Sequence, residues 1–319
     1  MALTARAEQA TRSRFLDTLA ELLSEWGAGE AGELRPIFGE SLAEFTDAQI
    51  AGFAGRLETT GSDWGYHPPD PVATRLSRVV HRRVAAPGAE LYDQGGLAVA
   101  RERPVIFLGN HLSFIDANAV DFLLHREGHG DIAARLTVLM GPKVFSLPLR
   151  RLASLCFGAI KLPQSPSRAS GEAVLSKRET LRLAYRALET ARERRERGEH
   201  LLIFSEGSRS RTGSMQRALP AVARYIENPW ATVVPFGVWG TEKMLPLGED
   251  HAYVYPVCVR IGRAFEARRL FERPHLSRTV ISDAIGYLTA DLLPREYRGF
   301  YSGTPSELAE ARALASSLA

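Results

Sequence analysis

Cysteine is scarce in this sequence. The chain of 319 residues holds two cysteines, Cys156 and Cys258, which lie far apart. This excludes a network of disulfides, and the surroundings of neither cysteine show metal-ligand spacing. The pattern fits a protein of the reducing cytoplasm, and we expect both thiols to be core residues.

Long hydrophobic runs are also missing. No stretch of about 18 apolar residues occurs, which argues against a membrane-spanning helix. The first 15 residues, MALTARAEQATRSRF, lack the apolar segment of a signal peptide. We therefore expect a cytoplasmic protein that meets a membrane, if it does, from the surface at the inner face.

Three nucleotide-binding and hydrolase signatures do not apply. The chain has no Gly-Lys pair, hence no phosphate-binding P-loop, and no G-x-S-x-G nucleophile elbow. GAGEAG at 27–32 matches G-x-G-x-x-G, but it follows a predicted helix instead of a strand, and Pro36 stands where the helix should run. We interpret residues 27–32 as a linker.

Charge is nearly balanced, with a net of +3, so nucleic acid is not an expected partner. Residues 1–85 carry 9 basic and 12 acidic side chains, which leaves 31 and 25 for the remainder. The positive excess therefore lies after residue 85, where an anionic substrate or surface becomes a candidate partner.

The hydrophobic pattern of the chain changes near residue 86, from helical spacing alone to strand-like runs that alternate with helical spacing. Residues 9–27 repeat leucines at helical spacing, and residues 40–58 and 70–85 predict further helices. Later apolar runs at strand length alternate with helical patterns, which predicts an α/β sheet. These runs are 104–109, 136–141, 200–205, 232–240 and 253–262. We predict a helical N-terminal region (1–85), a main domain (86–300) and a C-terminal tail with a short helix (301–319).

GNHLSFID, residues 109–116, follows the first of these strands. If a helix begins after residue 112, Asp116 can fold back onto the ring of His111. A carboxylate on one imidazole nitrogen fixes the tautomer and leaves the other nitrogen free to take a proton. The alternative is a polar cluster that caps the helix start, since such residues are common there.

FSEGSRSRTG, residues 204–213, follows another predicted strand. Gly207 permits close approach of a ligand, and Arg209 lies among hydroxyl side chains, a combination that binds phosphate. The alternative is a solvated loop. Beside His111 and Asp116, the stretch becomes an anion site next to a base.

Together with VVPFGVWGTEKMLP (233–246), the order and spacing of these stretches resemble the glycerolipid acyltransferases, chiefly the bacterial 1-acylglycerol-3-phosphate acyltransferases. The resemblance spans residues 86–262. It implies an α/β fold with a central mixed β-sheet flanked by helices. It also implies an O-acyltransferase of phospholipid biosynthesis, with acyl-CoA or acyl carrier protein as donor, a lysophospholipid as acceptor, and neither cofactor nor metal.

The resemblance also implies roles for single residues. His111 would take the proton of the acceptor hydroxyl, and Asp116 would orient His111. The remaining substrate-binding residues would be Glu206, Gly207, Ser208 and Arg209, with Pro235 on the acyl-donor side. Where relatives have an acidic residue followed by arginine, this chain has Pro163 and Gln164. We expect Lys143 or Lys161, or the neighbouring Arg150 and Arg151, to supply the missing charge.

Two questions stay open at this stage. Residues 143–157 mix apolar and basic side chains, which fits either a membrane-surface helix or core packing with one basic edge. We expect 1-acylglycerol-3-phosphate as acceptor. The alternative acceptors are glycerol-3-phosphate and a non-phosphate lysolipid. The alternative function is that of a non-catalytic module that binds acyl-CoA or lipid.

Overall fold

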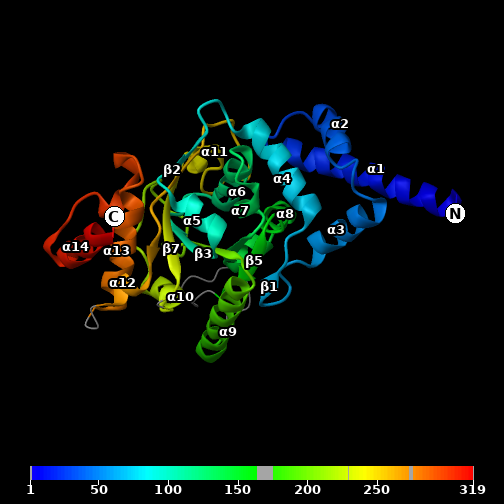
Figure 1. The fold of residues 1–319 in the computed structure, drawn as a ribbon. Coiled ribbons are helices and arrows are strands. Elements are labelled where there is room, and N and C mark those ends of the chain that lie inside the picture. Colours follow the sequence, from blue (N-terminus) through cyan, green and yellow to red (C-terminus); the bar gives the residue numbers. More distant parts are fainter. Residues whose placement is uncertain (1, 164–174, 229, 273–275, 319) are drawn as a thin grey trace.

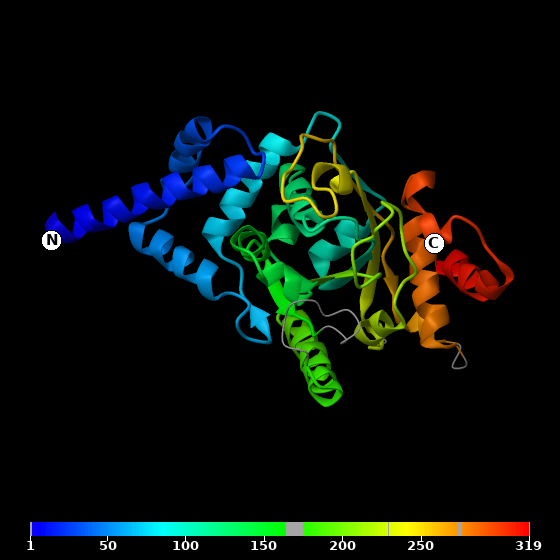
Figure 2. The ribbon, with the colours of Figure 1, turned by 180° about the vertical axis from the view of Figure 1, so that it is seen from behind.

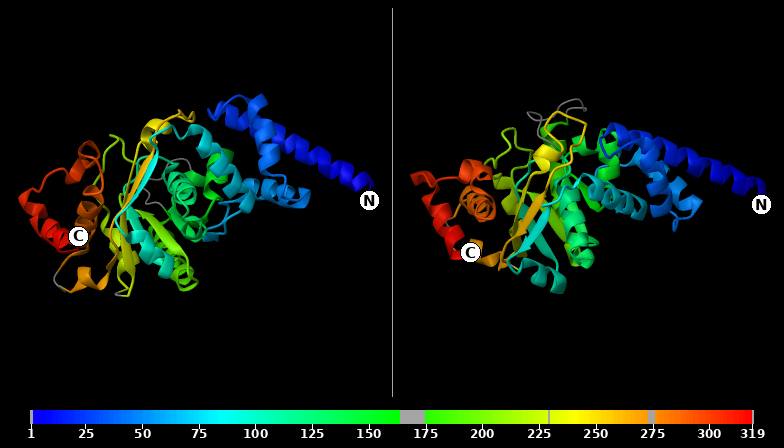
Figure 3. Two further views of the ribbon diagram at one scale, coloured as in Figure 1. Left: turned by 45° about the horizontal axis from the view of Figure 1, so that its top comes forward. Right: turned by 90° about the horizontal axis from the view of Figure 1, so that it is seen from above.

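The fold is built on one mixed β-sheet that helices cover on both faces (Figures 1 and 3). The computed structural model describes residues 2–163, 175–228, 230–272 and 276–318. Nine strands in these ranges follow the order β1-β5-β4-β6-β3-β7-β8-β2, with β9 also paired to β7. They are β1 (Tyr66–His67), β2 (Glu90–Asp93), β3 (Val105–Gly109), β4 (Leu136–Met140), β5 (Gly158–Lys161), β6 (His200–Phe204), β7 (Thr232–Trp239), β8 (Cys258–Ile261) and β9 (Phe265–Glu266). The predicted α/β fold with a central mixed sheet is confirmed.

Helices precede the sheet, connect its strands and follow it. They are α1 (Ala2–Glu25), α2 (Ala31–Ser41), α3 (Asp47–Thr59), α4 (Pro71–Val84), α5 (Gly96–Glu102), α6 (Asp116–Arg126), α7 (Gly130–Ala133), α8 (Pro148–Ser154), α9 (Lys177–Glu196), α10 (Ala223–Ile226), α11 (Thr241–Met244), α12 (Arg268–Phe271), α13 (Arg278–Ala290) and α14 (Ala309–Leu318). The N-terminal helices lie at one end of the molecule and α12–α14 at the other (Figures 1 and 2). Within the ranges listed above, no helix is long and apolar enough to cross a membrane.

Strand β3 lies at the centre of the sheet, parallel to β6 on one side and β7 on the other. All five of its residues are buried. Val105 and Phe107 join the core cluster that contains α1–α4 and α6, whereas Ile106 and Leu108 join the cluster that contains α9, α13 and α14. Alternate side chains of one strand thus serve opposite faces, which explains the unbroken apolar run.

Two N-terminal boundaries differ from the predictions. The helix expected from residue 40 begins at Asp47, because Thr46 and Gln49 form a capping box there. Helix α2 runs through Pro36, so the linker assigned to residues 27–32 is wrong at its end. Pro36 has no N–H to donate to the carbonyl four residues earlier, and burial of Leu34 and Phe38 offsets the missing hydrogen bond.

Candidate active site

The turn between β3 and α6 is fixed to both neighbouring strands. Asn110, fully buried, exchanges two hydrogen bonds with the backbone of Val238 in β7, each 2.8 Å long. On the other side, the backbone nitrogen of Ser205, just after β6, donates to the carbonyl of Gly109 over 2.8 Å. His111, the next residue, is therefore held at the carboxyl edge of the parallel strands, where α/β sheets place their ligands.

His111 and Asp116 are in direct contact. Nδ1 of His111 lies 2.8 Å from Oδ2 of Asp116, and the carboxylate is fully buried. The same carboxylate accepts hydrogen bonds from the backbone nitrogens of Leu112 and Ser113 and from the hydroxyl of Thr241, the last over 2.5 Å. Because Asp116 is the acceptor in each of these bonds, Nδ1 of His111 is the donor and Nε2 carries the free lone pair.

The other contacts of His111 restrict its ring and its backbone. The ring stacks on Phe204 with 4.2 Å between the centroids and 14° between the planes. The backbone nitrogen donates to Oε1 of Glu206 over 2.8 Å, and the backbone carbonyl accepts from Ser210 over 2.8 Å. His111 retains 18% of its side-chain exposure, so its free edge can be reached from outside.

Glu206 connects two loops from inside the protein. Its second oxygen accepts a 2.7 Å hydrogen bond from the backbone of Gln216, and burial raises its pKa to about 8. The following Gly207 has a φ of +65°, the left-handed conformation that glycine adopts most readily. Ser208 is exposed. The turn thus carries the chain from the buried Glu206 to Arg209.

Arg209 shares an aromatic ring with a second arginine. Its guanidinium carbon lies 3.4 Å from the ring centroid of Phe114, and that of Arg150 lies 4.3 Å from the same centroid. Burial, and next the charge of Arg150, lower the pKa of Arg209 to about 10. Arg150 also forms a 2.9 Å ion pair with the exposed Asp250. Two cationic groups therefore lie against Phe114, which follows His111 by three residues, and their closeness favours binding of an anion.

The structure distributes the remaining predicted residues over three places. Lys143 is exposed after β4, and Pro235 is buried in β7 beside β3. The ammonium of Lys161 is buried, donates to the carbonyl of Gly61 over 2.7 Å and lies over the ring of Trp64. Its charge thus joins β5 to the N-terminal region, and its assignment to a substrate phosphate stays a prediction. Gln164 lies outside the described residues.

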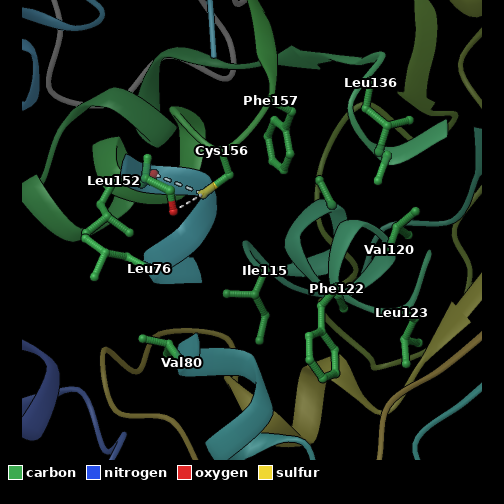
Figure 4. Close-up of a cluster of buried hydrophobic side chains, with 14 of the residues drawn as sticks. Leu76, Val80, Ile115, Val120, Phe122, Leu123, Leu136, Leu152, Cys156 and Phe157 are labelled. Atoms are coloured by element: carbon green, nitrogen blue, oxygen red, sulfur yellow. Dashed lines mark hydrogen bonds between the residues drawn. The ribbon is translucent and has the colours of Figure 1, made fainter. Parts of the chain in front are cut away.

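An apolar cavity of about 510 Å³ begins beside this turn. Phe114 and Ile115 line its inner part, and α1, α4, α8 and the loop at 245–251 supply the other walls. Figure 4 shows Ile115 in the buried cluster that side chains of α4 (Leu76 and Val80) and α8 (Leu152) complete. The geometry therefore combines a histidine with a free ring nitrogen, two arginines on one aromatic ring and an apolar cavity. The ranges that the structure describes contain no cluster of three metal-ligating His, Cys, Asp or Glu side chains.

Some residues of the site escaped the sequence analysis. They are three side chains inside the stretches quoted above whose contacts no local sequence pattern indicates. Thr241 contacts Asp116, Phe114 contacts Arg209, and Phe204 contacts His111. Thr241 is placed by Gly240, whose φ of +88° turns the chain sharply after β7. A side chain on Gly240 would lie 2.3 Å from the carbonyl of Pro256.

Of the comparisons with known proteins, the family model agrees with the motifs. No curated protein matches the sequence. Among solved structures, the 1-acyl-sn-glycerophosphate (LPA) acyltransferase PlsC from Thermotoga maritima aligns over 80% of this chain and 96% of its own, with 13% identity and a TM-score of 0.44. Residues 91–239, which contain His111, Asp116, Glu206 and Arg209, match the family model described as Acyltransferase. Residues 91–239 are therefore similar to the acyltransferase family, which supports a glycerolipid acyltransferase family for this chain.

Proposed function

We propose that the protein transfers a fatty acyl group from acyl-CoA or acyl carrier protein to the free hydroxyl of 1-acylglycerol-3-phosphate. The observation that carries the proposal is the contact of 2.8 Å between His111 and the buried Asp116, beside two arginines on one ring. A base next to an anion site fits an acceptor that bears both a hydroxyl and a phosphate.

In the proposed reaction, Nε2 of His111 removes the proton of the acceptor hydroxyl as the oxygen attacks the thioester carbonyl. The C–O bond forms, the tetrahedral intermediate collapses, and the C–S bond breaks. The leaving thiolate takes the proton back from Nε2, so the enzyme ends in its starting state. Asp116 stabilises the transient imidazolium, and Glu206 fixes the backbone at His111. The thioester is already activated, so no covalent enzyme intermediate is required.

Arg209 and Arg150 are the proposed phosphate ligands. Neither is committed to a buried carboxylate in the described residues: Arg209 lies on Phe114, and the partner of Arg150, Asp250, has an exposed side chain. A guanidinium binds phosphate through paired hydrogen bonds, and partial burial strengthens them. Arg150 lies near the position of the family's acceptor motif, which supports it as the substitute for the arginine that Gln164 replaces.

We also propose that the cavity mouth contacts the membrane. The membrane-surface helix considered at 143–157 is not what the structure contains, because Phe145, Leu152 and Phe157 are buried in the core. Leu147 remains exposed and lines the cavity, and the exposed Leu247 lies in the loop whose ends line it too. Apolar side chains at the entrance of an apolar cavity fit a lipid substrate that enters from a bilayer.

Replacing His111 with Ala should lower turnover by about 10²–10⁴-fold, because the general base is lost. The assay is release of free thiol from acyl-CoA in the presence of acceptor. His125→Ala is the matched control, since His125 is exposed at the far end of α6. Unchanged thiol release in the folded His111→Ala protein would favour the non-catalytic lipid-binding alternative.

Arg209→Ala and Arg150→Ala should each raise the KM for 1-acylglycerol-3-phosphate by about 10–100-fold, the value of a charge-assisted hydrogen bond. The KM for acyl-CoA should change little, and a lysolipid without phosphate should not distinguish the variants from wild type. Arg211→Ala, in the same loop but exposed, serves as control. A larger effect on acyl-CoA than on acceptor would place these arginines at the donor.

Thr241→Val should lower kcat by about tenfold with little change in the KM for acyl-CoA, since the hydroxyl positions Asp116 without touching substrate. Thr241→Ser retains the hydroxyl and should restore kcat. A valine variant with wild-type kcat, or a serine variant as slow as valine, would remove Thr241 from the positioning network.

The double variant Leu147→Asp, Leu247→Asp should bind anionic phosphatidylglycerol vesicles at least severalfold more weakly than wild type, because it places charges where apolar side chains meet the bilayer. Co-sedimentation measures the bound fraction. Leu181→Asp is the control, since Leu181 is equally exposed on α9, away from the cavity. Equal loss in control and double variant would argue for a general effect of charge.

A further inference from the structure

The apolar cavity contains a buried polar strip that the proposed reaction does not use. Most of the lining consists of aliphatic and aromatic side chains. Ser77 and His81 on α4 and Asn118 on α6 also line it, and each is less than 5% exposed. Buried polar groups are costly in apolar surroundings unless they have partners. Each polar group of the strip is therefore expected to have a hydrogen-bond partner.

His81 is the unsatisfied member of the strip. Its Nδ1 lies 2.9 Å from the carbonyl oxygen of Ser77, one turn earlier in α4. A carbonyl only accepts, so Nδ1 carries the proton and Nε2 is an acceptor. Burial lowers the pKa of His81 to about 4, which keeps the ring neutral. In the part of the chain that the structure describes, Nε2 is buried and has no hydrogen-bond partner.

The other two members use their groups on the protein. Nδ2 of Asn118 donates to Oγ of Ser77 over 3.3 Å and to the carbonyl of Ala153 over 3.1 Å. Oγ of Ser77 in turn lies 3.4 Å from Nδ1 of His81. The three side chains thus form one connected group. What it lacks is a donor for His81, and the neighbouring wall residues, such as Val80 and Ile115, have no polar side chain to offer.

One member of the strip, Asn118, shares helix α6 with Asp116. Asn118 follows Asp116 by two residues on α6, a rise of about 3 Å along the helix. Ile115, which lines the cavity, immediately precedes Asp116. A chain whose carbonyl group is held at His111 and which enters the cavity past Ile115 would meet the strip in the part of the chain near its carboxyl end.

We propose that this cavity selects an acyl chain with a hydroxyl group near its carboxyl end, and that this hydroxyl donates a hydrogen bond to Nε2 of His81. The inference rests on the proposed function, because the acyl chain is a substrate of that reaction. An unsubstituted chain fits the apolar walls but leaves His81 unpaired, which lowers its affinity relative to the hydroxylated chain.

The test compares chains of equal length that are saturated, 3-hydroxylated or hydroxylated at the terminal carbon. Each is offered once in the acyl-CoA donor and once in the lysophospholipid acceptor. We expect kcat/KM about tenfold higher for the 3-hydroxy chain than for both others, in one of the two arms. That arm identifies the substrate whose chain occupies the cavity. Equal kcat/KM for all chains in both arms, or a preference for the terminal hydroxyl, would overturn the proposal.

His81→Leu removes the acceptor at similar volume and should abolish the preference, so that the 3-hydroxy chain falls to the saturated chain or below. Val80→Ala, on the same helix and lining the same cavity, should change both rates in proportion and keep their ratio. A preference that persists in His81→Leu would assign the selection to another group and overturn the role of His81.

A binding measurement separates this proposal from the proposed function. Calorimetry of the free 3-hydroxy and saturated fatty acids with wild-type protein requires no turnover. If no donor is consumed but the 3-hydroxy acid binds about tenfold more tightly, the proposed reaction fails and the cavity proposal stands. If both acids bind equally, with a water on His81 as the simplest explanation, the cavity proposal fails whatever the enzyme transfers.

Discussion

The carboxylate of Asp116 is the interaction on which the site depends. Four groups donate to it: the ring of His111, the backbone nitrogens of Leu112 and Ser113, and the hydroxyl of Thr241. The backbone donors fold the turn after β3 around the carboxylate, so the same atoms that start α6 also place the imidazole. One structure in this protein therefore forms the polar cluster at the helix start and the proposed catalytic pair, so the two interpretations of GNHLSFID do not exclude each other.

The sheet adds contacts to His111 and Asp116 from outside their own turn. Parallel pairing of β3 with β6 and β7 brings their carboxyl ends to one edge, and each neighbour contributes a contact from its own end. Beyond β6, Glu206 accepts from the backbone of His111, and beyond β7, Thr241 donates to Asp116. His111, the proposed base, is thus restrained by contacts from three strands that are far apart in the sequence, which suits a site that must hold its geometry during proton transfer.

The sequence predicts those features of the fold and the site that residues close together in the chain determine. The apolar run of β3 and the short spacing of His111 and Asp116 follow from neighbours along the chain. The path of α2 through Pro36 could not be predicted, because burial of Phe38 decides it. Nor could the pairing of Arg150 with Arg209 on Phe114, since it joins residues that only the tertiary fold brings together. Lys161 looked equivalent to them as a charge, but burial commits it to Gly61.

The charges around Phe114 support the proposal that the acceptor's phosphate binds at the two arginines. Two guanidiniums on one ring repel each other, and this repulsion contributes to the lowered pKa of Arg209. A phosphate bound between the two guanidinium groups would be attracted to both and would offset their mutual repulsion. The pair of arginines therefore favours binding of an anion. The cavity beside Phe114 is lined mostly by apolar side chains, and Arg150, which shares the ring of Phe114 with Arg209, also lines it. In the proposed reaction the phosphate would lie at the two arginines and the chain against the apolar walls, with the hydroxyl to be acylated within reach of His111.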